Sequence, residues 1–281
     1  MSLVSESKPS RAAPTDVPRF GFGANWSSFS KHVDAERVRE ARDSITTRLG
    51  DISDLSFLDA GCGSGLFSLA AAELGAIRVH SFDFDEDSVT TTRSLKDRFR
   101  PATSSWTIER GDVLNLGYVE QLGPWDIVYS WGVLHHTGNM EQAWANVATS
   151  VAPGGRLFIS IYNDQGLNSR LWSLVKRTYH RVPAPLRPLY VVLAMGPREA
   201  LSALATGPVG YVRNWREYKS NRGMSRWHDL VDWVGGYPFE VAKPEIVFDF
   251  FQARGFALEW MSTCAGGLGC NQFVFKRAPG E

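Results

Sequence analysis

A glycine-rich segment after a short apolar run is the part of the sequence best suited to hold a ligand. It reads LDAGCGSG over residues 58–65 and opens into the helical pattern LFSLAAAEL. Glycines let the backbone pass close to a ligand, and a helix N-terminus presents amide N–H groups to it. A dinucleotide fingerprint reads GxGxxG, but Leu66 stands where its third glycine belongs. The spacing therefore argues against a nicotinamide-dependent oxidoreductase, the alternative enzyme class.

Acidic residues at the ends of two later β-type runs extend this candidate site. Asp83 lies 20 residues beyond Gly63, where a carboxylate can accept hydrogen bonds from both hydroxyls of a ribose. Asp112 follows the third run and can accept a hydrogen bond from an exocyclic amine. Asp85 either caps the next helix or shares the ribose, and we favour the cap. These residues indicate a ligand that carries a ribose.

Two adjacent histidines, His135 and His136, follow the fourth β-type run. The carboxyl end of a parallel strand opens into the ligand crevice, and a neutral imidazole can remove a proton near pH 7. We therefore expect this pair to supply a catalytic base. Adjacent residues of a helical turn do not share a face, so at most one points at a substrate and the pair does not chelate a metal. The alternative role for each is a helix cap or a bond to the backbone.

Alternating strands and helices must position these residues. Five β-type runs precede residue 164, at 55–59, 77–82, 106–109, 125–130 and 156–162, with helices predicted at 64–75, 86–100 and 139–149 and a turn near 115–122. Runs such as IVYS and LFISI are apolar on both faces, which is typical of a parallel sheet covered by helices. A helix from Pro244 and two last runs, at 256–261 and 272–276, complete a seven-stranded, mostly parallel α/β sheet with helices on both faces.

The chain divides into four parts by composition. Residues 1–19 are rich in Ser, Pro and Ala and are predicted to be a flexible tail, and a helix capped by Asp34 and stopped by Gly50 opens the ligand-binding core of residues 20–163. Residues 164–242 break the alternation and form a helical insertion after strand five, which we expect to select the substrate. Residues 243–281 return to the core as its last helix and final β-hairpin.

Five ordered motifs over residues 52–162 resemble those of the class I S-adenosylmethionine (SAM) dependent methyltransferases. They read LDAGCGSG, VHSFDFD, GDVL, WDIVYSWGVLHH and APGGRLFISIYND. The resemblance implies a Rossmann-like fold, SAM as cofactor and transfer of its methyl group by in-line displacement. It also implies cofactor contacts along the chain: Asp59 at the ammonium group, Gly61, Gly63 and Gly65 beside the methionine part, Asp83 at the ribose, Asp112 and Val113 at the adenine, and Ser130 and Trp131 under the sulfonium.

The histidine pair is similar to that of the ubiquinone-type small-molecule methyltransferases, which implies O-methylation of a small-molecule or lipid-like acceptor. A tRNA or protein methyltransferase and a SAM-binding protein without transferase activity are the alternatives. Candidate acceptor contacts are Trp26, Tyr162, Asn163, Arg222, Trp227 and His228. Each has a plainer alternative: Trp26 is a lid or a core anchor, Tyr162 and Asn163 end a strand, and the insertion residues pack or are solvated.

The insertion carries a net positive charge that the rest of the chain balances. Between Gln165 and Arg226 there are eleven basic residues and two acidic ones, although the whole chain has 30 of each and no net charge. Such asymmetry indicates an interaction surface, and an anionic small molecule, an anionic membrane or RNA could use it. The segments RLWSLVKRTYHRV and LYVVLAM suit a peripheral membrane contact. Nucleic acid is the less favoured partner because no RNA-binding motif is present, and a solvated cap is the alternative.

The composition limits the class of protein, its expected location and the kinds of site it can hold. The 281 residues include 43% hydrophobic and 21% charged residues, which is enough for a packed core. The three cysteines form no CxxC pair, which predicts a cytoplasmic protein without a zinc or other metal site. The N-terminus lacks the apolar stretch of a signal peptide, and no apolar run reaches the length of a membrane span. Nothing in the sequence fixes the oligomeric state.

Overall fold

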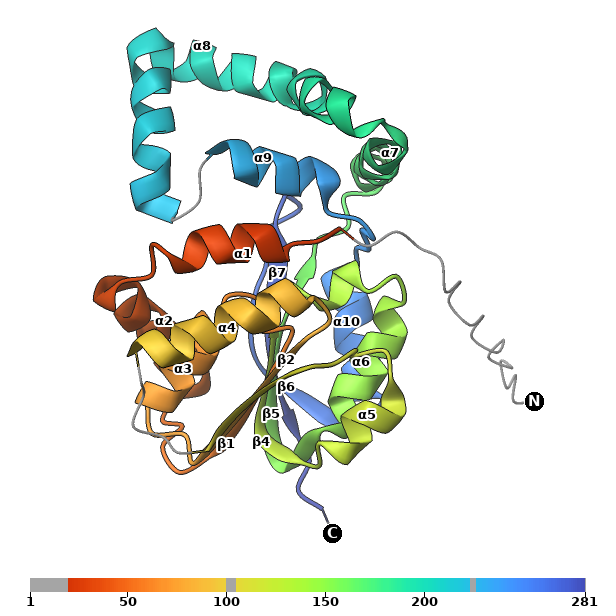
Figure 1. Cartoon of the computed structure of the whole chain (residues 1–281). Coiled ribbons are helices and arrows are strands. Elements are labelled where there is room, and N and C mark those ends of the chain that lie inside the picture. Colours follow the sequence, from red (N-terminus) through yellow and green to blue (C-terminus); the bar gives the residue numbers. More distant parts are fainter. Residues whose placement is uncertain (1–19, 100–104, 223–225, 281) are drawn as a thin grey trace, which may run out of the picture.

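A seven-stranded sheet forms the centre of the molecule, in a computed structural model that describes residues 20–99, 105–222 and 226–280 (Figure 1). The predicted tail of residues 1–19 lies outside the described residues, as do the side chains of residues 24, 217–222 and 228. The sheet order is β3-β2-β1-β4-β5-β7-β6. Strands β1 to β5 run parallel and β7 is antiparallel to both of its neighbours, which confirms the predicted α/β fold.

The strands follow the apolar runs of the sequence closely. Their bounds are β1 Ser56–Ala60, β2 Arg78–Asp83, β3 Trp106–Arg110, β4 Trp125–Trp131, β5 Val151–Tyr162, β6 Phe256–Ser262 and β7 Cys270–Arg277. Only β5 begins well before its predicted start, because Val151 pairs with Trp125 ahead of a register shift. All residues of β1 are buried, as expected for a strand covered on both faces.

Helices cover both faces of the sheet (Figure 1). One layer contains α2 Ala35–Leu49, α3 Leu66–Glu73 and α4 Glu86–Phe99, and the other contains α5 Leu116–Gln121, α6 Met140–Thr149 and α10 Pro244–Gln252. Residues Ile45 and Leu69 pack into the core of the first layer, and Trp144 and Phe251 into that of the second. The sheet is therefore a rigid platform whose carboxyl edge carries the loops of interest.

Helix α2 matches its prediction because its local signals agree with each other. The Asp34 side chain accepts a hydrogen bond from the Arg37 amide at 3.0 Å, and Val38 and Ile45 face the core. Gly50, with φ of 73°, ends the helix. A shorter helix, α1 Gly23–Ser30, precedes it and was not predicted, because its sequence GANWSSFS has no helical apolar period.

A helical cap, residues 164–242, covers the carboxyl edge of the sheet (Figure 1). It contains α7 Leu167–Arg181, a short 3-10 turn η2 Ala184–Leu186, α8 Arg187–Arg222 and α9 Arg226–Gly235. Helix α8 bends at Gly207, where φ is 68° and ψ is 164° and Pro208 follows. Tyr179, Val191, Met195 and Val234 form the separate core that holds the cap together.

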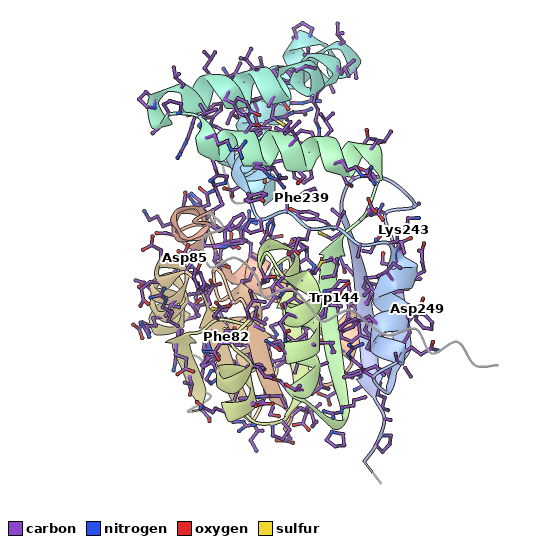
Figure 2. All side chains as sticks on the ribbon, turned by 90° about the vertical axis from the view of Figure 1, so that its right-hand side faces the viewer. Phe82, Asp85, Trp144, Phe239, Lys243 and Asp249 are labelled. Carbon is purple, nitrogen blue, oxygen red and sulfur yellow. The ribbon has the colours of Figure 1, made fainter. Side chains whose placement is uncertain are left out.

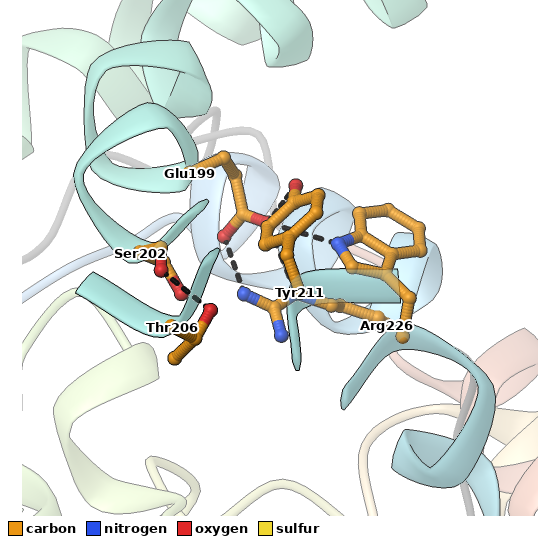
Figure 3. Close-up of polar contacts among 6 residues, drawn as sticks. Glu199, Ser202, Thr206, Tyr211 and Arg226 are labelled. Atoms are coloured by element: carbon orange, nitrogen blue, oxygen red, sulfur yellow. Dashed lines mark hydrogen bonds and ion pairs between the residues drawn. The ribbon is translucent and has the colours of Figure 1, made fainter. Parts of the chain in front are cut away.

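A partly buried polar cluster fixes the bent helix α8 to α9 (Figure 3). The Glu199 carboxylate accepts hydrogen bonds from Tyr211 Oη at 2.8 Å, Trp215 Nε1 at 3.2 Å and Arg226 Nε at 3.0 Å. The Arg226 guanidinium also lies over both rings. Of the helices in the described ranges, not one is long and apolar enough to cross a membrane.

Candidate active site

A cavity of about 930 Å³ lies between the carboxyl edge of the sheet and the cap. Its lining residues come from the loops after β1, β2, β3 and β4, from α1, and from α8 and α9 of the cap. This volume is at the upper end of the range for ligand pockets, so a cofactor and a second molecule can share it. We call the end near the glycine-rich segment the cofactor pole and the end under the cap the acceptor pole.

The glycine-rich loop has a backbone that other residues cannot adopt without strain. Gly61 has φ of +85°, and a Cβ there would lie 2.4 Å from Val133 Cγ1. Gly63 has φ of +54°, and its Cβ would lie 3.0 Å from the Trp26 ring. Both line the cavity, whereas Gly65 does not. Gly65 instead precedes α3 with φ of +79° and packs against Thr92, so its cofactor contact is not supported by the lining of the cavity.

Replacing Gly61 by alanine is expected to lower the unfolding free energy by about 2 kcal/mol or more and to weaken cofactor binding, because strain and a clash act together. Gly123 is the matched control, since its φ of +75° is equally strained for alanine but nothing lies within 4 Å of its Cβ. Denaturant melts of both variants separate the cost of backbone strain, which both variants share, from the cost of the clash, which only Gly61→Ala has. Equal losses of unfolding free energy for Gly61→Ala and Gly123→Ala would show that the contact with Val133 is unimportant.

The cofactor pole contains two buried carboxyl groups. Asp83 accepts hydrogen bonds from the Gly63 amide and the Asp85 amide, each at 2.9 Å, and burial raises its pKa to about 6. Asp59 accepts one from Ser68 Oγ at 2.5 Å, and burial raises its pKa to about 7. Both line the cavity. A cationic or hydroxyl-bearing ligand would offset the cost of burying these charges.

A chain of hydrogen bonds through the sheet orients Asp59. Trp106 Nε1 donates to Ser81 Oγ at 2.8 Å, and Ser81 Oγ donates to Ser68 Oγ at 2.7 Å. Ser68 in turn donates to Asp59, so every link points its hydrogen toward the carboxyl group. The four residues linked by these hydrogen bonds come from β3, β2, α3 and β1. The chain stabilises the ionised form of Asp59 against the effect of burial.

Of the other predicted cofactor residues, three lie on the cavity and one does not. Asp112, Val113 and Trp131 line it. Ser130 is completely buried, and its hydroxyl donates to the Ala60 carbonyl at 2.8 Å. A cofactor contact by the Ser130 side chain is therefore not supported: this side chain ties β4 to β1, and neighbouring residues of a strand face opposite sides of a sheet.

Helix α1 lies across the cofactor pole as a lid. Trp26 faces Gly63 and lines the cavity, which agrees with the lid alternative for this residue. Asp85 accepts from the Gly23 amide and from the Asp87 amide, each at 2.9 Å, so it caps α4 as expected and also fixes the start of the lid. Asp85 lies at the upper end of the core, below the cap (Figure 2). Asn25 Nδ2 donates to Asp232 of α9, so the lid is attached to the cap as well.

The two histidines differ in what their ring nitrogens contact. His136 Nδ1 lies 2.7 Å from the Pro238 carbonyl oxygen, which can only accept a hydrogen bond. The proton is therefore on Nδ1, and Nε2 keeps its lone pair. Burial lowers the pKa of His136 to about 3, so the ring is neutral at pH 7. His136 lines the cavity, and no other residue in the described part of the chain bonds its Nε2.

His135 is held by the backbone on both sides of its ring. Its Nδ1 accepts from the Tyr162 amide at 3.4 Å, and the backbone of Ser160 also bonds the ring. The ring is 1% exposed, and its centre lies 3.9 Å from that of Tyr162. Burial lowers its pKa well below the usual value. His135 lines the cavity as His136 does, but the backbone bonds its ring, so of the two predicted bases His135 fits the alternative role of a backbone-bonded residue.

Residues 236–240 of the cap hold the histidine turn in place. The Glu240 carboxylate accepts hydrogen bonds from the Gly138 amide at 2.9 Å and the Met140 amide at 3.1 Å. Amides at the start of a helix such as α6 have no acceptor within the helix, and Glu240 supplies one. The Glu240 amide donates to the His135 carbonyl at 2.9 Å. Together with the contact between Pro238 and His136, these bonds fix the imidazole relative to the cap. No local pattern in the sequence indicates Pro238 or Glu240, since both lie about 100 residues from the turn.

Aromatic side chains line the acceptor pole. Phe22 lies 5.0 Å from the His136 ring, and Tyr162 lies 5.4 Å from it. Phe20, Trp233 and Tyr237 complete the wall. Tyr162 is one of the acceptor contacts expected from the sequence. The aromatic segment WHDLVDWVGGYPFEV indicates Trp233 and Tyr237, whereas Phe20 and Phe22 lie outside it and have no comparable signal.

Two predicted acceptor contacts are corrected by the structure. Asn163 is 8% exposed and does not line the cavity, because its amide donates to the Gly267 carbonyl and accepts from Asn271, each at 3.0 Å. Asn163 therefore fits the plainer of its two expected roles, which is to end strand β5 and not to contact an acceptor. Trp227 packs into the core of the cap, and Arg226 and Asp229 line the cavity beside it. The side chains of Arg222 and His228 lie outside the described residues.

A buried lysine supports the acceptor pole from behind. Lys176 donates to the Trp233 carbonyl, and its Nζ lies 4.6 Å from the Trp233 ring centre and 4.8 Å from that of Phe239. Phe239 lies between the sheet and the cap (Figure 2). Burial lowers the pKa of Lys176 to about 7, against the opposing effect of Asp232, and burial raises the pKa of Asp232 to about 7. Asp232 lines the cavity, so a carboxyl group also faces the acceptor pole.

Known proteins resemble this chain in both sequence and fold. The profile of a methyltransferase domain matches residues 58–157. The ubiquinone biosynthesis O-methyltransferase of Caulobacter vibrioides is 30% identical over 115 residues, covering 39% of this chain and 41% of that protein. The tRNA U34 carboxymethyltransferase of Idiomarina loihiensis is 26% identical over 166 residues, covering 58% and 47%. This chain therefore spans less than half of these curated relatives.

A solved structure extends the likeness beyond the core. The magnesium protoporphyrin IX methyltransferase of Synechocystis PCC 6803 is 17% identical with a TM-score of 0.50, over 86% of this chain and 83% of that one. At this identity the likeness concerns the fold alone. The profile and the curated relatives, together with the sequence motifs, therefore support a class I SAM-dependent methyltransferase.

Proposed function

We propose that this protein transfers the methyl group of SAM to a hydroxyl oxygen of a small-molecule acceptor, with His136 as the base. The observation that carries the proposal is the state of His136, a cavity-lining residue whose ring is neutral with Nε2 unprotonated. A hydroxyl acceptor must lose a proton as it is methylated, and the Nε2 lone pair can accept it; burial makes this imidazole a weaker base than a solvated one, so its contribution depends on its position beside the acceptor. A neutral amine acceptor can attack the methyl carbon with its own lone pair before it loses a proton, so it would not need an imidazole base at the acceptor pole.

The cofactor pole fits SAM by its chemistry. SAM has a sulfonium, an ammonium and a carboxylate but no phosphate, so buried carboxyl groups attract it where they would repel a nucleotide phosphate. Asp83 would accept from the ribose hydroxyls, and Asp59 would lie near the ammonium group. Asp112 and Val113 would contact the adenine, and Trp26 would cover the ligand from the lid. SAM supplies an activated methyl carbon, which leaves its sulfur when an oxygen attacks from the opposite side.

At the acceptor pole the residues of this chain do three things. The rings of Phe22 and Tyr162 hold a planar or apolar acceptor beside His136. His136 Nε2 takes the hydroxyl proton as the oxygen forms its bond to the methyl carbon and the carbon–sulfur bond breaks. The lid and the cap exclude water, which would otherwise compete with the acceptor. Much of the acceleration then comes from holding the two reacting atoms in line.

A labelling experiment tests the proposal. SAM with a tritiated methyl group is incubated with the protein and an extract of its own cells, and the extract is then separated by size. We expect label in the small-molecule fraction, and the labelled group to resist mild base as a methyl ether does. The absence of any transferred label, although SAM binds, would favour a SAM-binding protein without transferase activity.

A macromolecular acceptor is the second candidate. The basic cap and the partial match to a tRNA-modifying enzyme favour it. An RNA acceptor would bring its phosphates to the arginines of the cap, and its binding would weaken steeply with salt. The same labelling experiment separates the two candidates, because label would then enter nucleic acid or protein and be released by nuclease or protease.

SAM affinity is expected to fall as the pH decreases from 7.5 to 5. The pKa of Asp83 in the free protein is about 6, so the carboxylate that accepts from the ribose hydroxyls becomes protonated over this range. Below pH 6 the affinity should drop by up to about tenfold per pH unit. Calorimetric titrations at several pH values check this. An affinity that is flat down to pH 5 would mean that Asp83 does not contact the ligand in its ionised form.

A further inference from the structure

Exposed apolar side chains gather on the side of the cap that faces away from the sheet. Among the residues whose exposure is described, eleven of the eighteen large apolar ones that are exposed lie between Leu167 and Val212. Those on α7, η2 and the first part of α8 are Leu167, Leu171, Leu174, Leu186, Leu189, Val192, Leu193, Leu201 and Leu204. Together with Arg170, Arg177 and Arg181 we call them the outer cap face. A patch of this extent on a protein surface marks a contact with something else.

Helical spacing puts these residues on one side of each helix. On α7, Leu167, Leu171 and Leu174 follow each other at i, i+4 and i+7, and Lys176 and Tyr179 point the opposite way into the cap. On α8, Leu189 and Leu193 are four residues apart, and the buried Val191 and Met195 face the core of the cap. Both exposed stripes therefore lie opposite the packing with α9.

Positive charges are interleaved with the leucines of α7. Arg170, Arg177 and Arg181 are exposed; Arg170 and Arg181 flank the leucines on the same side of the helix, and Arg177 lies farther round, with its guanidinium 5.8 Å from the Tyr237 ring centre. None of the three forms an ion pair with any residue that the structure describes. Glu199, an acidic residue of α8, is directed inward to Arg226 (Figure 3). Two copies of this face would repel each other, so the charges disfavour a second copy as the partner.

We infer that the outer cap face binds the surface of an anionic membrane. The leucines would enter the boundary between headgroups and acyl chains, and the arginines would pair with lipid phosphates, as in other amphipathic helices that lie on membranes. The cavity begins on the inner side of the same cap, where Met195 and Arg198 of α8 line it. Binding would bring the acceptor pole to within about one helix diameter, roughly 10 Å, of the lipid. The inference does not rest on the proposed reaction.

Flotation with vesicles tests this inference on the full chain. Vesicles of phosphatidylcholine alone are compared with vesicles that contain one third phosphatidylglycerol, at low and at physiological salt. We expect binding to the anionic vesicles that weakens with salt. Arg170→Gln with Arg181→Gln should lower the partition coefficient about fivefold for each charge removed. The control removes two exposed positive charges from the sheet domain, Arg39→Gln with Lys243→Gln, and should leave binding nearly unchanged.

The apolar contribution is tested in the same way. Leu171→Gln with Leu193→Gln should lower binding by roughly tenfold or more, and Ile77→Gln with Ile246→Gln, equally exposed on the sheet domain, should not. SAM affinity and the melting temperature report whether each variant is folded. Failure of the wild-type protein to float with anionic vesicles would overturn the inference. So would a dimer, seen in sedimentation, that only the leucine variants dissociate, because the outer cap face would then bind a second copy.

Discussion

Replacing His136 by asparagine is expected to lower the rate of methyl transfer by about 10²- to 10⁴-fold and to leave SAM affinity within a few-fold of the wild type. Asparagine keeps an N–H donor near the position of Nδ1, so the bond to the Pro238 carbonyl and the fold of the turn can persist. It removes Nε2, the atom that would take the acceptor proton. Single-turnover rates with the identified acceptor, together with calorimetry for SAM, check both parts.

His180 provides the matched control for this experiment. Its Nε2 lies 2.8 Å from the carbonyl oxygen of Gly235, the last residue of α9, so it too bonds the backbone of the cap, but it does not line the cavity. His180→Asn should therefore retain nearly the full rate. The pH dependence adds a further check: the pKa of His136 is about 3, so no loss of rate from its protonation is expected above pH 5. Loss of less than tenfold in His136→Asn would mean that the acceptor needs no base.

Replacing Asp83 by alanine is expected to weaken SAM binding by more than about 100-fold. Two hydrogen bonds from ribose hydroxyls to a buried carboxylate are lost, and bonds to charged groups contribute about 1.5–3 kcal/mol each. The Gly63 amide also loses its acceptor, so the glycine-rich loop is held less firmly. Calorimetry at pH 7.5 measures the affinity, and thermal melts establish that the variant is folded.

Asp126 is the matched control for Asp83. Its carboxylate also accepts two hydrogen bonds, from Ser56 N at 2.9 Å and Ser56 Oγ at 2.6 Å, but it lies at the start of β4, away from the cavity. Asp126→Ala should lower stability and leave SAM affinity unchanged. Similar affinities for Asp83→Ala and the wild type would contradict the assignment of the ribose to the end of β2.

The sequence predicts the sheet well because its strands are apolar on both faces and its helices have clear caps and apolar periods. The end of β2 at Asp83 and the cap of α2 at Asp34 follow from local signals alone. Family motifs locate the cofactor pole, since five short segments occur in a fixed order. These are properties of residues that are close together in the chain, and local patterns suffice for them.

The sequence does not predict which way a side chain of a strand or turn faces, or which residues distant in the chain contact each other. Both faces of β4 are buried, so hydrophobicity does not tell whether Ser130 or its neighbour Trp131 faces the cavity. Likewise His135 and His136 look equivalent until Pro238, from the far end of the cap, selects one by its carbonyl group. Helix α1 forms through contacts with Asp85 and Asp232 and not through its own apolar period. Each of these depends on residues brought together only by the fold.

A crystal structure with S-adenosylhomocysteine, the product left by SAM, tests the central claim most directly, because the claim assigns one cavity two poles. The account predicts the ribose hydroxyls within hydrogen-bond distance of the Asp83 carboxylate and the adenine beside Asp112 and Val113. It also predicts the sulfur directed toward the chamber that His136 and Tyr162 line. A ligand with its sulfur turned away from His136, or bound outside this cavity, would contradict it.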